Sequence, residues 1–289
     1  MRGRNPWTRK LGALVMALAL CVGLLPGTAL ATGENSWEHT SHDSGWTALT
    51  ADKLTELDYT LSNGKYYLSG TADEWGESYI LETTQQLTIT GTVALCLNNT
   101  RYTYEGSSDA AIVISEGADL IICCCQSDEW GNYDGMVSNS NVSYGIYNAG
   151  TLTVTGGGIF INQENGAAIY NAGTCTISGG SMNGTAGWWE NYKTAYGIFN
   201  ANGAKLTISG SPSISGTAPG DMNDPSGPQI DILTYDMIYV DDLDTSSFEN
   251  YKSYNIGYYG TPGEAVVSGV AGVPDPWWGH VLYFPHQTC

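Results

Sequence analysis

Basic side chains are scarce in this chain. Its 289 residues include 10 Lys and Arg against 29 Asp and Glu. Four of the ten basic residues stand at the very start: Arg2, Arg4, Arg9 and Lys10. From position 32 onward the chain therefore carries six basic and 29 acidic residues, a formal charge of −23, and Arg101 is its only arginine. Nucleic acid and anionic lipid surfaces are bound through clustered Lys and Arg, so we expect neither as a partner.

Long hydrophobic runs are also rare. The apolar run over residues 11–25 has 15 residues, fewer than the roughly 20 that span a bilayer. It follows a basic start and precedes Pro26-Gly27 and Ala29-Leu30-Ala31, which is the order of a secretory signal. We therefore predict a signal peptide over residues 1–31, with an uncleaved anchor as the alternative. The mature protein is expected to be secreted or extracellular, or held at the cell surface, with no membrane insertion after signal removal.

Cysteine is sparse as well, with seven residues, six of them after position 31. Export would permit disulfides. The run Cys123-Cys124-Cys125 is too tight for a tetrahedral zinc site, and no histidine stands near it in the sequence. Adjacent strand residues face opposite sides, so Cys123 and Cys125 share one side and Cys124 faces inward. A disulfide from Cys96 to Cys123 or Cys125 fits between stacked strands, and the sequence leaves the choice open.

Glycine, by contrast, is abundant, with 37 residues, and the chain is repetitive. Three segments nearly superimpose, over residues 144–157, 167–180 and 196–210. Within each one, apolar residues such as Leu152 and Val154 alternate with threonines such as Thr153. Alternation of this kind predicts a strand with its apolar face inward, and repetition at this period is the signature of a solenoid.

Each repeat holds three such runs, which predicts coils of three short strands around a triangular core. Weaker versions extend the array to about six coils between Ile80 and Ile256. We assign the second strand of successive coils to Leu87, Leu120, Leu152, Cys175, Leu206 and Ile238, which makes Cys175 a core residue. The steps between these positions exceed the shortest coil in most places, so we predict inserted loops over residues 98–110, 126–142, 185–195 and 217–228, where function normally resides.

Asparagine recurs at one place in the three strongest repeats, as Asn148, Asn171 and Asn200. A stacked asparagine ladder satisfies buried turn backbone and the side-chain amides together. We interpret these residues as structural, because buried polar groups must be paired. A ligand-binding role is the alternative.

The repeats resemble the pectate-lyase-like right-handed parallel β-helix superfamily, and more narrowly the repetitive secreted and cell-surface β-helix proteins of Gram-positive gut-type bacteria. The likeness rests on the units around residues 144–157 and on the run 87–98, and it covers about residues 80–260. It implies an all-β, right-handed, single-stranded parallel β-helix. Around that helix we expect an N-terminal cap over 32–79 and an irregular tail over 261–289. We place His39 and His42 of the cap on a solvated segment, with metal binding by these histidines as the alternative.

The resemblance also raises the question of enzymatic activity. Pectin-degrading hydrolases of that superfamily imply Asn-Thr-Asp, Asp-Asp, Gly-His and Arg-Ile-Lys elements on successive coils. Only Asp241-Asp242 and Gly279-His280 occur. We therefore predict no catalytic residues and favour a protein that is not an enzyme, while a polysaccharide-degrading enzyme of pectate lyase or glycoside hydrolase type stays open.

Two loops carry residues suited to ligand binding. Trp188, Trp189 and Tyr192 lie on an inserted loop and could stack on sugar rings, with packing onto the solenoid as the alternative. Asp221, Asn223 and Asp224 offer oxygen ligands for calcium, the one cofactor we consider, with solvated acidic turns as the alternative.

The leading functional hypothesis is a monomeric binding or adhesion module that recognises glycans or a host or cell-surface component through its corner loops. A polysaccharide-degrading enzyme and a passive structural segment of a larger adhesin are the alternatives. The sequence leaves the ligand, any activity, the disulfide pairing and the oligomeric state open.

Overall fold

The structure is a computed structural model, and it describes part of the chain. Side chains and backbone are described for residues 42, 45–72, 79–125, 135–139, 142–186, 195–210, 212–216 and 231–234, and backbone alone for 238–240, 255–258, 267–268 and 280–281. The chain divides into two compact units, Met1–Glu38 and His39–Cys289, and every described residue belongs to the second. The predicted signal peptide over 1–31 lies outside the described residues.

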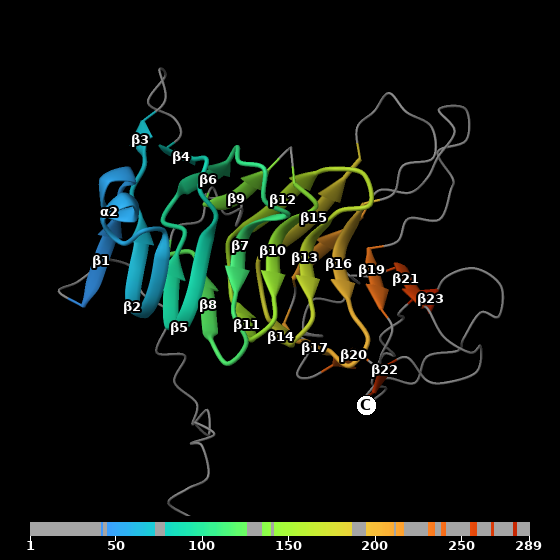
Figure 1. The fold of residues 1–289 in the computed structure, drawn as a ribbon. Coiled ribbons are helices and arrows are strands. Elements are labelled where there is room, and N and C mark those ends of the chain that lie inside the picture. Colours follow the sequence, from blue (N-terminus) through green and yellow to red (C-terminus); the bar gives the residue numbers. More distant parts are fainter. Residues whose placement is uncertain are drawn as a thin grey trace, which may run out of the picture. The chain divides into compact units, whose positions relative to one another are not determined.

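Most strands of the second unit fall into three rows (Figure 1). The first row contains β7 (Ala110–Ile114), β10 (Tyr144–Asn148), β13 (Ala167–Asn171), β16 (Tyr196–Asn200), β19 (Ile232–Thr234) and β21 (Asn255–Tyr258). The second row contains β8 (Asp119–Cys123), β11 (Thr151–Val154), β14 (Thr174–Ile177), β17 (Lys205–Ile208), β20 (Ile238–Val240) and β22 (Val267–Ser268). The third row contains β4 (Tyr79–Thr83), β6 (Thr100–Tyr104), β9 (Met136–Asn139), β12 (Gly158–Asn162), β15 (Ser181–Thr185) and β18 (Ser213–Ser215).

Strands pair along a row and not with their neighbours in sequence. β10, for example, pairs in parallel with β7 on one side and β13 on the other, and β13 pairs with β16. The long strand β5 (Leu87–Cys96) joins the first and second rows, because it pairs with β7 and with β8. The twelve strands of these rows, β5 and three further strands described below, β1, β2 and β23, form a sheet of 16 described strands. The third row, with β3 (Thr71–Ala72), forms a sheet of seven described strands. The prediction of an all-β chain with parallel strands is confirmed.

The segment predicted as a cap adds to the parallel pairing. β1 (Trp46–Leu49) pairs with β2 (Thr60–Leu68), and β2 pairs with β5, both in parallel. Between them lies the short helix α2 (Ala51–Glu56), whose first turn is capped by the Thr50 hydroxyl, which accepts from Lys53 N at 3.2 Å. Among the described residues, no helix is both long and apolar enough to cross a membrane. Strands β3 and β23 (His280–Val281) pair antiparallel, with β4 and β21.

The register differs from the sequence prediction at Leu87. Five of the six predicted second-strand positions follow one another in register: Leu120, Leu152, Cys175, Leu206 and Ile238. Leu87, however, pairs with Ile112 of the first row, while Val93 is the partner of Leu120. The assignment of Leu87 to the second strand is therefore wrong. The cause is that β5 runs through the junction of both rows, so two alternating runs in one strand look alike in sequence.

The predicted loop over 98–110 contains a strand. β6 pairs with β4 and β9 in the third row, and its Tyr102 and Tyr104 side chains are buried in the core. The run Thr-Arg-Tyr-Thr-Tyr does alternate, but its inward residues are tyrosines, which sequence reasoning does not count as core residues. The loop over 126–142 likewise contains β9. Arg101, the only arginine after position 31, is exposed on β6.

The inward side chains of the three rows form one continuous hydrophobic core. In one repeat Ile146, Leu152 and Ile159, one from each row, are fully buried. A small residue sits beside the first-row isoleucine because the third row packs against it. A Cβ atom at Gly145 would lie 2.8 Å from Ile159 Cγ2. The Tyr-Gly-Ile order of the repeat therefore reflects packing between rows.

The Gly-Gly pairs of the repeat turn the chain from the second row into the third. Gly157 and Gly180 hold φ angles of 86° and 83°, which glycine adopts without strain. A Cβ atom at Gly180 would lie 2.5 Å from Gly157 O, closer than side chains allow. Each turn thus stacks tightly on the one before it.

Candidate functional site

Aromatic side chains gather on the outward side of the first row. We call this set the aromatic stripe, and it consists of Tyr144 and Tyr147 on β10, Tyr170 on β13, and Tyr196 and Phe199 on β16. The Tyr147 and Tyr170 rings stack with centroids 5.3 Å apart and planes 8° apart. Tyr170 and Phe199 stack in turn at 4.9 Å and 11°. All five side chains are half-buried.

Strand register produces this stack. Tyr147, Tyr170 and Phe199 are partners across β10, β13 and β16, and parallel strands lie about 4.8 Å apart. Their inward neighbours Ile146 and Ile169 are fully buried, so the aromatic rings face away from the core. Stacked rings cover one another's faces. The stripe therefore presents ring edges and, at its tyrosines, hydroxyl groups along its length.

A carboxylate lies at one end of the stripe. Tyr144 tilts against Tyr170 with centroids 4.7 Å apart, and its backbone N–H donates to the Asp109 carbonyl oxygen at 2.9 Å. Burial raises the pKa of the Tyr144 hydroxyl, and the neighbouring Tyr170 and Asp109 raise it further. The Tyr144 hydroxyl therefore stays protonated at neutral pH and can donate, while the exposed Asp109 carboxylate can accept. An aromatic surface beside such a pair suits a hydroxyl-rich neutral ligand.

The asparagines lie on the opposite, inward side of the same strands. Asn148, Asn171 and Asn200 are partners in register and have no exposed surface. Each amide donates to the next oxygen, Asn148 Nδ2 to Asn171 Oδ1 and Asn171 Nδ2 to Asn200 Oδ1, both at 2.7 Å. Asn200 Nδ2 continues the chain of bonds to Thr234 Oγ1 at 3.1 Å. Buried and paired in this way, the amides are out of reach of an external ligand.

The cysteines suggested for a disulfide are close together as thiols. Cys96 and Cys123 are partners in register, and Cys96 Sγ lies 3.6 Å from Cys125 Sγ. Burial and the neighbouring Cys96 raise the pKa of the Cys125 thiol to about 12. Cys124 packs against the core, as alternation along the strand predicts. Cys175 is a fully buried core residue between Leu152 and Leu206, as predicted.

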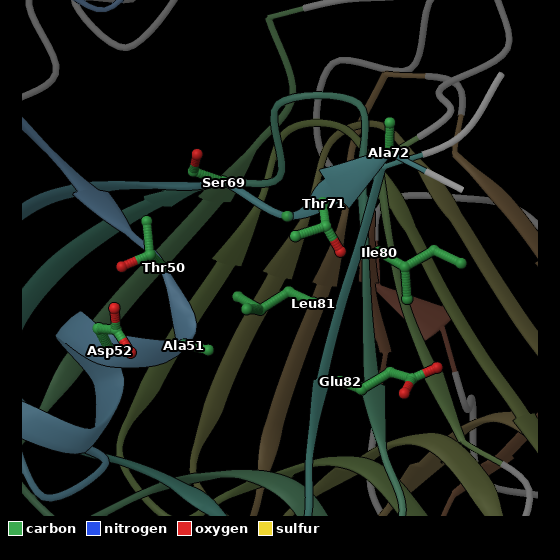
Figure 2. Close-up of a pocket in the computed structure, with 10 residues that line it drawn as sticks. Thr50, Ala51, Asp52, Ser69, Thr71, Ala72, Ile80, Leu81 and Glu82 are labelled. Carbon is green, nitrogen blue, oxygen red and sulfur yellow. The ribbon is translucent and has the colours of Figure 1, made fainter. Parts of the chain in front are cut away.

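The cavity in Figure 2 is a poor candidate for catalysis. It measures about 540 Å³ and is lined by residues from the start of α2, from residues 69–72, which include β3, and from strand β4. Its two carboxylates, Asp52 and Glu82, are both exposed. In Figure 2 the Leu81 side chain extends toward α2, whereas Glu82 extends to the other side of β4, away from Asp52. Two carboxylates that diverge in this way do not flank a glycosidic bond.

The loop residues singled out from the sequence lie outside the described residues. These are the aromatic group Trp188, Trp189 and Tyr192 and the calcium candidates Asp221, Asn223 and Asp224. Sequence reasoning missed the aromatic stripe, although its signal is present: an aromatic residue precedes the ladder asparagine in all three strong repeats. It also expected His42 on a solvated segment, but His42 is half-buried and its ring stacks on Tyr67 at 4.0 Å.

Comparison with models of protein families, with curated proteins and with solved structures finds no match to this chain.

Proposed function

We propose that this chain is a secreted or cell-surface protein that acts by binding neutral glycans. We further propose that its rows of strands are the faces of a right-handed parallel β-helix of about six three-strand coils, of the pectate-lyase-like kind, as the repeats suggest. Parallel pairing between strands three places apart in the chain supports this architecture. The Asn ladder and the stacked Gly-Gly turns fit it as well.

The observation that carries the binding proposal is the aromatic stripe. Its rings repeat at about 5 Å along the first row, which gives a ligand with repeating units a repeating surface. Tyrosine suits such contacts because an apolar ring carries a polar hydroxyl at its wet end. Because the stripe lies on strands, the backbone register fixes its geometry. Its side chains therefore lose little conformational entropy when a ligand binds.

Charge decides the class of glycan. With six basic against 29 acidic residues after position 31, the chain repels polyanions such as pectin. Asp109, at the end of the stripe, adds a local negative charge that favours sugar hydroxyls over carboxylates. A neutral polysaccharide or oligosaccharide is therefore the ligand that the stripe and the charge favour together.

A glycan array tests the proposal. The secreted chain, with and without calcium, should bind neutral glycans, and chelation of calcium should leave that binding unchanged. A Tyr147→Ala/Tyr170→Ala double variant should lose the signal, while Tyr79→Ala, which removes a 46% exposed tyrosine from the third row, should keep it. The Trp188→Ala/Trp189→Ala variant separates the loop from the stripe. Loss in that variant alone, or depolymerisation of pectin by the wild type, would contradict the proposal.

A further inference from the structure

A histidine from the N-terminal segment meets two cysteines on the outer side of the second row. His42 Nε2 lies 3.7 Å from Cys125 Sγ, and Cys125 Sγ lies 3.6 Å from Cys96 Sγ. The three ligand atoms all lie within 4.8 Å of one another. They come from positions 42, 96 and 125, which only the folded chain brings together. We propose that this cluster, with its cysteines reduced, binds one zinc ion.

The distances match a zinc coordination sphere. Zn–S bonds near 2.3 Å and Zn–N bonds near 2.0 Å in a tetrahedron place neighbouring ligand atoms roughly 3.5–3.8 Å apart. The S···S distance of 3.6 Å and the S···N distance of 3.7 Å are edges of that size. An ion can therefore enter with small side-chain adjustments. A water molecule takes the fourth position.

The surroundings hold the ligands in place. Tyr67 is the register partner of Cys96, and its ring stacks on the His42 ring with planes 16° apart. Trp46 packs edge-on against the same imidazole at 5.5 Å. Cys96 is fully buried on an outward-facing strand position, between the core residues Leu95 and Leu97. Ligands fixed by packing lose little freedom when a metal binds.

The donor set selects the kind of metal. Two thiolates and one imidazole are soft and borderline ligands, which suit zinc and do not suit calcium or magnesium. The side-chain oxygen Oδ1 of Asn98 lies 3.7 Å from Cys125 Sγ. The Asn98 side chain is held in place because its Nδ2 donates to Leu68 O at 3.0 Å. A disulfide between Cys96 and Cys125 is the alternative to zinc binding. A disulfide would not involve the His42 imidazole, whereas a zinc ion would bind it.

Zinc binding to the reduced full-length chain tests the site. Dialysis against zinc alone should leave one ion per chain, and cobalt in its place should give a sulfur-to-metal charge-transfer band. Cys96→Ser and Cys125→Ser should each weaken zinc binding at least tenfold, and His42→Ala about tenfold. The control Cys175→Val removes a buried core thiol that is no part of the cluster, on a strand that pairs with β11. This variant should bind zinc as the wild type does.

Thermal unfolding shows which variants are folded and whether zinc stabilises them. Zinc should raise the Tm of the wild type and of Cys175→Val, and at the same zinc concentration it should raise the Tm of His42→Ala less. Because His42 is half-buried, its removal leaves a folded chain even if a cysteine variant fails to fold. Equal zinc affinity in wild type and His42→Ala would overturn the proposal. So would a chain that is isolated with a Cys96–Cys125 disulfide and takes up no zinc after reduction.

Discussion

At the scale of single residues, the Asn ladder shows how one polar side chain serves several backbone groups. Asn171 Oδ1 accepts from Asn148 Nδ2 and from Gly173 N, and its Nδ2 donates to Asn200 Oδ1 and to Lys205 O. Upstream in the same register column stand Ile89 and Ile114, so an apolar residue also fits the space. The ladder therefore stabilises because it is complete, and an interruption leaves buried partners unpaired.

Asn171→Ile should lower the free energy of unfolding by about 3 kcal/mol, because it removes the partners of several buried groups at once. Urea denaturation followed by circular dichroism measures the loss. Thr176→Ala, on the outward side of the neighbouring strand β14, should change stability by less than about 0.5 kcal/mol. Similar small losses in both variants would mean that the ladder is not a source of stability.

Cys175 gives the chain a pH dependence of known sign. Burial raises the pKa of its thiol above the ordinary value of about 9, so the folded protein keeps the thiol protonated while the unfolded chain ionises it. The stability that the neutral thiol provides is present below pH 9 and is lost as the pH rises above it. From pH 8 to pH 10 the loss should be about 1.4 kcal/mol.

The Cys175→Val variant lacks this loss, so its free energy of unfolding should fall less than that of the wild type between pH 8 and pH 10. Urea denaturation at the two pH values gives the difference, in which the titration of all other groups cancels. Parallel pH profiles of the two proteins would show that the thiol ionises as readily in the folded state as in the unfolded one.

At the scale of strands, the sequence predicts those strands in which apolar and polar residues alternate. The strong repeats gave correct strands because Leu152 and Val154 alternate with threonine, and the register of five second-row positions followed from them. Leu87 was misplaced because β5 carries two alternating runs, and Gly91 between them does not end the strand. Contacts between distant segments, such as His42 with Cys125, leave no trace in local pattern and could not be predicted.

Strand β6 was missed for a different reason, because its buried residues are tyrosines. Tyr102→Ala should destabilise the chain by about 3–5 kcal/mol, since it opens a large cavity at a residue with 1% exposure. Arg101→Ala, one position earlier and exposed, should cost less than about 0.5 kcal/mol. Thermal or chemical unfolding compares the two. Equal effects would mean that residues 100–104 form a loop, as the sequence suggested.

At the scale of the whole chain, one architecture produces two different faces of the first row. The same register that stacks amides inward stacks rings outward, so Asn171 and its neighbour Tyr170 belong to two ladders. The repeats of the sequence therefore contain the residues of the aromatic stripe. Only the strand register shows that their side chains lie together on the outward side of the sheet. For the proposed glycan-binding function, the strong negative charge disfavours anionic glycans as ligands.

Calorimetric titration of the best neutral glycan from the array tests the binding claim most directly. The wild type and the Tyr79→Ala control should bind it with equal affinity, at low and at moderate salt alike, because no ion pair is involved. Tyr147→Ala/Tyr170→Ala should bind at least tenfold more weakly, since it removes the centre of the aromatic stripe. Unchanged affinity in that double variant would contradict the account.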